Sequence, residues 1–421
     1  MSKTFCVRPW IHQQINSDGS IKVCCVSLED NVEFNAASAN LQQSFNSDIL
    51  KRIRTQMLNG EWPNECKVCR IEEEANLGTA RTREIEQWKD RFTFDDAVAT
   101  TNGDGSVNYG PRYLDLRFGN FCNLKCRICG PASSHSLYEE WAEYFGEEGF
   151  FDNHGYIKLV RNSKGRLTTT KYDWHLSELF WNQLEQSINN LEYIFMAGGE
   201  PLLIKRKEDF LKMCIDKGVA NKIVLAYSTN LSSIPERLLE LWKNFKQVRI
   251  SASIDGMGKV LEYQRYPIKW NSTLKNLQKL DKLSLIYPNI MSVINLTITV
   301  YNVFHLPEFM WWKINESKFK SINTLEQFPI IITHLLHNPN HLNIQVLPNH
   351  IKDNIKDCYT DWINKFEGNL HAIEILQTTL NFMYADDKSE NLPEFVKFTK
   401  FLDQSRGQNL KDVVPQLSEL I

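Results

Sequence analysis

The sequence predicts an α/β protein with a small module before its core and a helical extension after it. Three observations carry this prediction. Between residues 113 and 349, six apolar segments of strand length alternate with segments of helix length, which is the pattern of parallel βαβ units. The strand segments are mostly apolar rather than alternating, as expected when helices cover them. Eight of the ten cysteines lie before residue 130. The core is therefore either an open parallel sheet or a partial barrel.

Composition limits the possible partners and the compartment. The 421 residues, 42% hydrophobic and 24% charged, are enough for a sizeable core in two or three domains. The net charge of −3 argues against nucleic acid and anionic membranes as partners. The start, MSKTFCVRPWIHQQ, lacks the apolar stretch of a signal peptide, and no apolar run approaches the roughly 20 residues of a membrane helix. We expect a cytoplasmic protein, where cysteines are more often metal ligands or core residues than disulfides.

The first 75 residues predict a small, irregular module. A strand pair is expected around SDGSIKVCC (17–25), because Asp-Gly is a turn signal, and a helix is expected over SDILKRIRTQMLNG (47–60). A segment with so little apolar content could be stabilised in its folded state by a metal centre. Residues 76–112 are charged and then rich in Gly and Asn, so they predict a connector.

A regular alternation fills residues 113–349. The six predicted strands are YLDLRFG (113–119), LEYIFMAG (191–198), KIVLAYSTN (222–230), QVRISASID (247–255), MSVINLTITVYN (291–302) and LNIQVLP (342–348). Helices are predicted between them, with an insertion rich in Gly, Lys and Thr at 146–172. Residues 350–421 predict a helical C-terminal extension without a chemical motif.

Three cysteines stand close together directly after the first of these strands. Cys122, Cys126 and Cys129, in FCNLKCRICG, have the spacing C-x3-C-x2-C. They follow the carboxyl end of a strand, where α/β barrels place their chemistry. Zinc would need a fourth protein ligand, and a cubane iron–sulfur cluster is normally held by four cysteines. Three thiolates therefore predict a cluster with one iron open to a ligand that is not protein.

This pattern resembles the radical S-adenosylmethionine (SAM) enzymes, whose hallmark is C-x3-C-x2-C after the first barrel strand. The resemblance implies a partial (β/α)6 TIM-type barrel over 113–349 and a 4Fe–4S cluster whose open iron binds the amino and carboxylate groups of SAM. An electron from the cluster then cleaves the sulfonium to methionine and a 5'-deoxyadenosyl radical. The resemblance also implies oxygen sensitivity and an electron donor such as flavodoxin or ferredoxin.

Further motifs follow in the order that the family shows. FMAGGEPLL (195–203) resembles the family's GGEP motif, whose acidic residue faces the amino group of SAM. AYSTN (226–230) and ISASIDG (250–256) end the next strands, where family members bind the ribose and carboxylate of SAM, and LEYQRYP carries an arginine frequent in a related subgroup. For each polar residue the alternative is a turn or helix-cap role. The predicted cofactor-binding residues are Gly198, Gly199, Glu200, Ser228, Asn230, Ser253 and Arg265.

A second set of cysteines lies in the N-terminal module. Cys6 and Cys24 form C-x12-G-x4-C with Gly19, and Cys66-x2-Cys69 follows after a long gap. Two cysteine pairs on a module too small to fold alone predict a closed metal site, which could also be a zinc ribbon. Neighbouring strand side chains point apart, so normally only one of Cys24 and Cys25 can ligate. The G-x4-C spacing favours Cys24, although the two roles could be exchanged.

The spacing of this second set resembles the first half of the SPASM cluster domain, or its shortened twitch form. There, four cysteines hold one auxiliary 4Fe–4S cluster. The further cysteines of a full SPASM domain are missing here, so one auxiliary cluster is predicted. Those domains usually follow the barrel, whereas this small iron–sulfur module precedes it.

The resemblance implies hydrogen abstraction from a substrate, most often a peptide or protein side chain, with the auxiliary cluster assisting electron transfer. Radical modification of a small molecule, such as a carbohydrate or nucleotide, is one alternative. A non-catalytic iron–sulfur binding protein is another, against which the intact triplet and GGEP motif argue. No general acid or base can be assigned, because the radical itself performs the abstraction.

Overall fold

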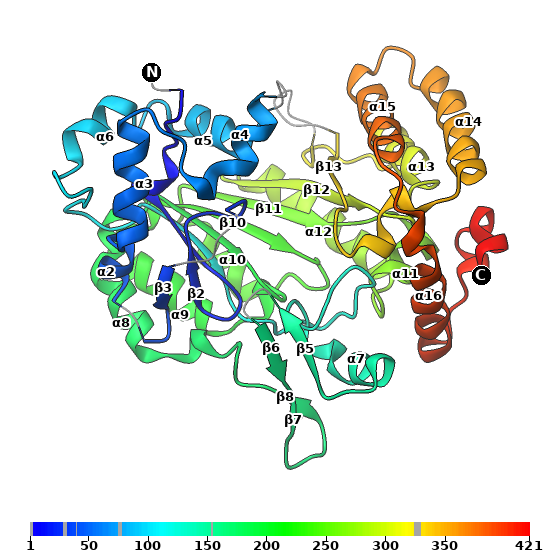
Figure 1. Cartoon of the computed structure of the whole chain (residues 1–421), viewed down its shortest axis with the longest axis horizontal. Helices are drawn as coiled ribbons and strands as arrows, with labels where there is room; N and C mark the ends of the chain where they lie inside the picture. The colour runs from blue at the N-terminus through cyan, green and yellow to red at the C-terminus, as the bar shows by residue number, and fades with distance from the viewer. Residues whose placement is uncertain (1–2, 28–31, 39, 75–77, 153–154, 324–329) are drawn as a thin grey trace. The chain divides into compact units, whose positions relative to one another are not determined.

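The computed structural model describes residues 3–27, 32–38, 40–74, 78–152, 155–323 and 330–421 (Figure 1). The chain divides into two compact units. Unit 1 comprises Met1–Phe121, Thr169–Tyr227 and Arg237–Val248, and unit 2 comprises Cys122–Thr168, Ser228–Glu236 and Arg249–Ile421. The predicted division into residues 1–75, 76–112, 113–349 and 350–421 stays a prediction, and its first boundary lies outside the described residues.

Unit 1 is built on a sheet whose strand order is β10-β9-β4-β1-β2-β3. β4 runs parallel to both β1 and β9, and β9 runs parallel to β10, whereas β2 is antiparallel to β1 and to β3. These strands are β1 (His12–Ile15), β2 (Ser20–Lys22), β3 (Val32–Asn35), β4 (Tyr113–Arg117), β9 (Tyr193–Ala197) and β10 (Val224–Thr229), which ends in unit 2.

One face of this sheet forms an apolar core. Leu114 on β4 lies opposite Ile194 on β9, and Leu116 lies opposite Met196. All four are fully buried. Burying each such side chain contributes roughly 1.5–3 kcal/mol before the cost of ordering it. The other face carries polar residues in alternate positions, a departure from the mostly apolar, non-alternating strands that the sequence predicts.

The predicted N-terminal strand pair is present, and it joins the main sheet. Gly19 turns the chain between β1 and β2 with a φ of 85°, a value that glycine adopts without strain. Asp18 accepts hydrogen bonds from the backbone and side chain of Ser20 in the same turn. Because β1 pairs with β4 from His12↔Tyr113 to Ile15↔Leu116, the N-terminal region extends the parallel sheet.

Helices fill the rest of unit 1. The predicted helix at 47–60 is α3, and Ser47 caps it by accepting from the Leu50 amide. The predicted connector contains two helices, α5 and α6, each begun by a capping box. The helices are α1 (Arg8–Ile11), α2 (Leu41–Phe45), α3 (Asp48–Leu58), α4 (Lys67–Glu74), α5 (Ala80–Trp88), α6 (Phe94–Thr100), α8 (Glu178–Ser187), α9 (Arg206–Asp216) and α10 (Glu236–Trp242), whose first residue belongs to unit 2.

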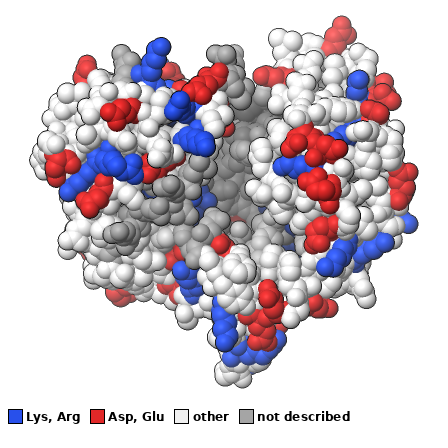
Figure 2. Space-filling view, in the orientation of Figure 1, with Lys and Arg blue, Asp and Glu red and all other residues white. Residues whose placement is uncertain are grey.

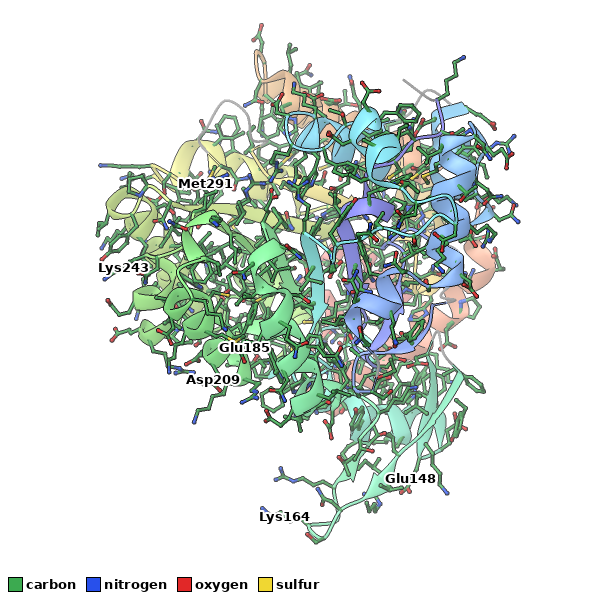
Figure 3. All side chains as sticks on the ribbon, turned by 90° about the vertical axis from the view of Figure 1, so that its left-hand side faces the viewer. Glu148, Lys164, Glu185, Asp209, Lys243 and Met291 are labelled. Carbon is green, nitrogen blue, oxygen red and sulfur yellow. The ribbon has the colours of Figure 1, made fainter. Side chains whose placement is uncertain are left out.

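Unit 2 holds the remaining strands. β12 (Ile290–Ile298) lies beside β11 (Gln247–Ser253, in unit 2 from Arg249) and runs parallel to β13 (Ile332–Leu335). The insertion forms two hairpins, β5 (Gly149–Asp152) with β6 (Gly155–Lys158), and β7 (Val160–Arg161) with β8 (Leu167–Thr168). Lys164 marks the tip of the second hairpin (Figure 3).

The helices of unit 2 confirm the predicted helical C-terminal region. They are α7 (Tyr138–Phe145), α11 (Gly258–Gln264), α12 (Trp270–Ile286), α13 (Leu306–Trp311), α14 (Asn349–Lys365), α15 (Leu370–Tyr384) and α16 (Leu392–Arg406). A π-helical turn, Trp312–Glu316, continues α13. None of the helices in the described ranges is long and apolar enough to span a bilayer.

The sixth strand lies elsewhere than predicted. LNIQVLP (342–348) forms a short 3-10 helix at Ile344–Val346, and the last strand is β13, at 332–335. The Asn343 side chain accepts from the Gln345 amide, a local turn that competes with strand pairing. Pro348 has no amide hydrogen to donate to a neighbouring strand. With this correction the predicted fold class is confirmed as α/β with a largely parallel sheet.

Charged side chains are mixed on the surface. On the face drawn in Figure 2, basic and acidic groups alternate over the described residues of each unit without forming a broad basic area. This distribution agrees with the net charge of −3, and it gives a phosphate backbone no continuous track on this face.

Candidate active site

The three-cysteine loop follows β4 and is held by short-range hydrogen bonds. Cys122 and Cys126 are buried and Cys129 is half-buried. The Cys129 amide donates to the Cys126 carbonyl at 3.1 Å, which closes a turn. His135 Nδ1 accepts from the Cys122 amide at 3.2 Å, and the Ser136 hydroxyl donates to the Cys122 carbonyl at 2.8 Å. The segment that leads into α7 therefore fixes the first cysteine.

The loop is also fixed through the residues between its cysteines. The Lys125 amide donates to the Tyr266 carbonyl at 2.7 Å, and the Arg127 amide donates to the Gln264 carbonyl at 2.8 Å. The Arg127 guanidinium is fully buried and donates to Asp403 at 2.6 Å. Asp403 lies on α16, so the C-terminal extension holds the cysteine loop directly.

Arg265 acts electrostatically on two of the cysteines. Its Nε donates to Asp255 at 2.7 Å in a buried ion pair. The hydrogen bond between Cys126 and Cys129 raises the pKa of Cys126 and lowers that of Cys129, and the positive charge of Arg265 acts to lower both. A fixed cation beside thiols stabilises their thiolate form, which is the form that binds metal. The predicted cofactor residue Arg265 therefore lies within reach of the cysteine loop.

Asn230 is likewise brought to the loop. Its Nδ2 lies 3.0 Å from Asn123 Oδ1 and 3.7 Å from Cys122 Sγ, both as a donor. The side-chain oxygen Oδ1 of Asn230 accepts a hydrogen bond from the Ser232 amide. The predicted residues Ser228 and Ser253 are half-buried at the carboxyl ends of β10 and β11.

The Gly-Gly-Glu segment lies in unit 1, against the chain that leads into the cysteine loop. The Gly199 amide donates to the Gly119 carbonyl, and the Glu200 amide donates to the Phe121 carbonyl at 2.7 Å. A Cβ atom on Gly199 would lie 2.2 Å from the Phe121 oxygen, and Gly198 has a φ of 100°. Both positions therefore require glycine for backbone packing.

Glu200 is buried, and its Oε1 accepts from the Leu202 amide at 3.0 Å. Lys207 on α9 donates to the Pro201 carbonyl at 2.7 Å. Burial lowers the pKa of Lys207 to about 7, although Glu200 and Glu208 act to raise it. The acidic residue of the motif thus lies near a buried lysine that no sequence motif singles out.

The N-terminal cysteines interact electrostatically with one another. Burial raises the pKa of Cys6 to about 12 and that of Cys66 further, and Cys6, Cys24 and Cys69 all contribute to the rise at Cys66. Cys25 is exposed and accepts from the Arg8 guanidinium at 3.3 Å. The two neighbouring cysteines have different surroundings, which fits the choice of Cys24 as the ligand.

Both sets consist of thiols alone, the donors that iron–sulfur clusters use. In the described ranges no group of three or more His, Cys, Asp or Glu side chains is arranged to hold one metal ion. In a cubane each thiolate binds a different iron, so the sulfurs lie farther apart than they do around a single tetrahedral ion. By donor chemistry, Cys122, Cys126 and Cys129 fit one cluster, and Cys6, Cys24, Cys66 and Cys69 fit a second.

Sequence reasoning missed several residues that hold this site. Asn123 and Arg127 stand inside the cysteine motif, and their position was the available signal. Asp255, in the ISASIDG segment, is fully buried and binds both Arg265 and the Thr297 amide. Asp403 is 276 residues from its partner Arg127, and nothing local in the sequence connects the two.

The fold is α/β, and the loop after β4 carries three cysteines, the donors that iron–sulfur clusters use. Residues 116–301 match the family model described as the Radical SAM superfamily. The match begins in β4, contains both the cysteine loop and the Gly-Gly-Glu segment, and extends beyond β12. This part of the chain is therefore similar to a radical SAM domain, which is the domain of an enzyme superfamily. No curated protein matches the chain.

Solved structures of low similarity were also found. The enzyme anSMEcpe with bound AdoMet and a Cp18Cys peptide has 15% identity and a TM-score of 0.36, with 61% of each chain covered. Streptococcus suis SuiB bound to S-adenosylmethionine has 15% identity and a TM-score of 0.34, with 72% of this chain and 58% of SuiB covered. The protein thus spans about 60% of the length of these structures, and likenesses with such TM-scores carry no argument about its function.

Proposed function

We propose that this protein is a radical SAM enzyme that reductively cleaves SAM and abstracts a hydrogen atom from a peptide or protein side chain. The observation that carries the proposal is the buried loop of Cys122, Cys126 and Cys129 beside Arg265, within the part of the chain that is similar to a radical SAM domain. A bound cluster with SAM would supply the 5'-deoxyadenosyl radical. The intact cysteine loop argues against a protein that keeps a cluster only for its structure.

Different residues of the chain would hold the cluster, orient SAM and support the cysteine loop. Cys122, Cys126 and Cys129 would hold the cluster, and the Arg265 charge would stabilise their thiolates. Gly198, Gly199, Glu200, Ser228, Asn230 and Ser253 would orient SAM, as the family resemblance implies. Arg127 and its partner Asp403 would keep the loop rigid, because their ion pair is buried. Rigid support of this kind holds a site in its reactive geometry.

A second 4Fe–4S cluster would be bound by Cys6, Cys24, Cys66 and Cys69. Support comes from their mutual electrostatic influence and from the resemblance to twitch and SPASM modules. This cluster would assist electron transfer, and the first electron would come from a donor such as flavodoxin or ferredoxin. A zinc ion held by the same four thiols is the rival assignment, and it would leave the module a purely structural role.

The peptide or protein substrate rests on the same resemblance, with a carbohydrate or nucleotide as the alternative. One experiment decides between them. Reduced protein is given SAM and a deuterated cell lysate that has been split by size, and mass spectrometry follows deuterium in the released 5'-deoxyadenosine. Label arriving only with the high-mass fraction supports a peptide or protein substrate. Label arriving with the low-mass fraction moves the assignment to a small molecule.

Metal analysis tests the two cluster sites. Anaerobically reconstituted protein should carry about eight irons, because each cubane holds four. Replacing Cys122, Cys126 and Cys129 with Ala should leave about four and abolish SAM cleavage. Cleavage by this variant would show that the active site lies elsewhere, and about four irons with one zinc in the parent protein would refute the auxiliary cluster.

A further inference from the structure

A cluster of buried polar side chains lies on one face of the unit 1 sheet. The register places His12 on β1 opposite Tyr113 on β4, and Gln14 opposite Asp115. Because alternate strand residues share a face, Arg117 belongs to the same side. Ring contacts agree, since His12 and Tyr113 have centroids 4.5 Å apart. This face therefore carries polar groups where the opposite face carries the apolar core.

Two residues from outside the sheet complete this cluster. Arg8 on α1 donates to Glu84 on α5 at 2.7 Å, and both side chains are about 11% exposed. Both charges act on the titration of Asp115, so they lie within electrostatic range of β4. We call this set the inner polar cluster; its members are Arg8, His12, Gln14, Glu84, Asp115 and Arg117.

Each member of the inner polar cluster has a buried atom that forms no hydrogen bond with the described part of the chain. These atoms are Arg8 Nε, His12 Nε2, Gln14 Oε1, Glu84 Oε2, Asp115 Oδ1 and Arg117 Nε. Folded proteins contain few buried polar atoms without a hydrogen bond, because each has lost its hydrogen bonds to water without gaining others. Two of them, Asp115 Oδ1 and Arg117 Nε, lie 3.5 Å apart as an ion pair. The other four, on neighbouring side chains, indicate a missing polar ligand.

The chemistry of these atoms restricts that ligand. His12 Nδ1 lies 3.2 Å from the Val23 carbonyl and must donate to it, so Nε2 is left as an acceptor. Burial also lowers the pKa of His12, which keeps the ring neutral. The open acceptors are thus His12, Gln14 and Glu84, and the open donor is Arg8. Asp115 and Arg117 are paired with each other. Two carboxylates balance two guanidinium groups, which favours an uncharged ligand.

We propose that the inner polar cluster binds an uncharged amide of the substrate, either a backbone amide or an Asn or Gln side chain. An amide N–H can donate to Glu84 and to Gln14, while its carbonyl accepts from Arg8. The proposal rests on the proposed peptide or protein substrate, and it assigns the N-terminal residues Arg8, His12, Gln14 and Glu84 a part in substrate choice.

The test measures binding of short blocked peptides to the reconstituted full-length protein. Acetyl-Gly-Gln-Gly-amide is compared with the peptides that carry Leu, Asp or Lys at the centre, and with glucose, by anaerobic calorimetry. The Gln peptide should bind at least about tenfold more tightly than each of the others, since a lost hydrogen bond at a desolvated site costs about that factor. Equal or tighter binding of glucose, of the Leu peptide or of a charged peptide overturns the proposal.

Two neighbouring glutamines provide a matched pair of variants. Gln13 is also buried on β1 with one open oxygen, but it faces the other side of the sheet and donates to Ser44 at 2.7 Å. Gln14→Met should weaken binding of the Gln peptide about tenfold, and Gln13→Met should not. If Gln14→Met does not fold, Glu84→Gln, which keeps the side-chain shape, should produce the same loss.

The remaining outcomes distinguish failure of the proposed binding site from failure of the proposed function. Binding of no peptide at all would mean that ordered water alone satisfies the cluster, and the proposal would fail. Unchanged binding by both Gln14→Met and Glu84→Gln would also overturn it. SAM cleavage by the dithionite-reduced parent protein without any peptide is measured separately. Its absence would refute the proposed function, while a peptide preference lost in Gln14→Met would still establish the binding site.

Discussion

At the scale of single residues, Cys24 and Cys25 show how local surroundings separate two identical side chains. Cys25 is exposed and accepts a hydrogen bond from Arg8, whereas Cys24 is influenced by both Cys25 and Cys69. The motif spacing alone left the exchange of their roles open. The arrangement of the thiols favours Cys24, because a ligand must be near the other ligands of its cluster.

This difference predicts the metal content of two matched variants. Cys24→Ala should reduce iron from about eight to about four per chain, since removing one ligand destabilises a four-cysteine cluster. Cys25→Ala should keep about eight. Iron and sulfide analysis after anaerobic reconstitution checks both, and the reverse pattern would assign the ligand to Cys25.

The buried Lys207 beside the Gly-Gly-Glu segment predicts a pH dependence of stability. Its pKa is about 7 in the folded protein and about 10.4 in an unfolded chain. Below pH 7 both states are protonated, so folding bears the full cost of burying the charge. Between about pH 7 and 10 the folded state releases its proton first, so the unfolding free energy rises by up to about 1.4 kcal/mol per pH unit.

Lys207→Met removes this contribution. Relative to the variant, the parent protein should therefore gain stability between pH 7.5 and 9.5. Urea unfolding of both proteins at the two pH values measures the change. Lys212→Met, at an exposed position of α9, is the control and should show no such trend. A parent-to-variant difference that stays constant with pH would mean that Lys207 is not neutralised by burial.

At the scale of elements, α16 is the part of the C-terminal extension that supports the cysteine loop. Arg406 near its end donates twice to Glu140 on α7, and both side chains are almost fully buried. A mostly apolar pocket bounded by α7 and α16 reaches Cys126 and Cys129. The extension, which carries no motif, therefore takes part in the site through packing and ion pairs.

Breaking that ion pair should be costly. Arg406→Met leaves Glu140 buried with only Lys125 nearby at 3.3 Å, and removing one partner of a buried pair typically costs about 3 kcal/mol. We expect the unfolding free energy to fall by about that amount and the reconstituted iron of the cysteine loop to be lost faster. Chemical denaturation and absorbance decay measure the two effects.

Two further variants make this test specific. The double variant Arg406→Met with Glu140→Met should recover much of the stability, because no buried charge is left unpaired. Lys400→Met, at an exposed position of α16, should change neither quantity. Equal losses in the double and single variants would show that packing, and not charge pairing, is what Arg406 contributes.

At the scale of the whole molecule, the sequence predicted what local patterns and motifs encode. Apolar periodicity located the strands of the parallel sheet, and the spacing of Cys122, Cys126 and Cys129 predicted their loop. Prediction from the sequence failed where contacts between residues far apart in the chain determine the structure. LNIQVLP has the composition of a strand, but Asn343 turns it locally and β13 takes the edge position. The pairing of β1 with β4 joins segments about 100 residues apart, and no local signal announces it.

That pairing makes a prediction about the N-terminal region as a whole. If residues 1–75 were a separate module held together by a metal centre, their removal would not destabilise the rest of the chain. In the structure, β1 covers the edge of β4, and Trp10, Ile11 and Ile15 are fully buried. Their removal would uncover a strand edge and apolar surface, each buried side chain being worth roughly 1.5–3 kcal/mol. A chain of residues 76–421 should therefore aggregate or lose cooperative unfolding.

The contribution of the strands can be separated from that of the second cluster. A full-length variant with Cys6, Cys24, Cys66 and Cys69 replaced by Ala keeps β1 and its buried residues but cannot bind metal there. It should stay monodisperse in size-exclusion chromatography and reconstitute about four irons on the remaining loop. If this variant aggregates as the truncated chain does, the metal centre and not the strand pairing holds the N-terminal region. If residues 76–421 alone unfold cooperatively and reconstitute four irons, neither contribution is needed and the N-terminal region is an appended module.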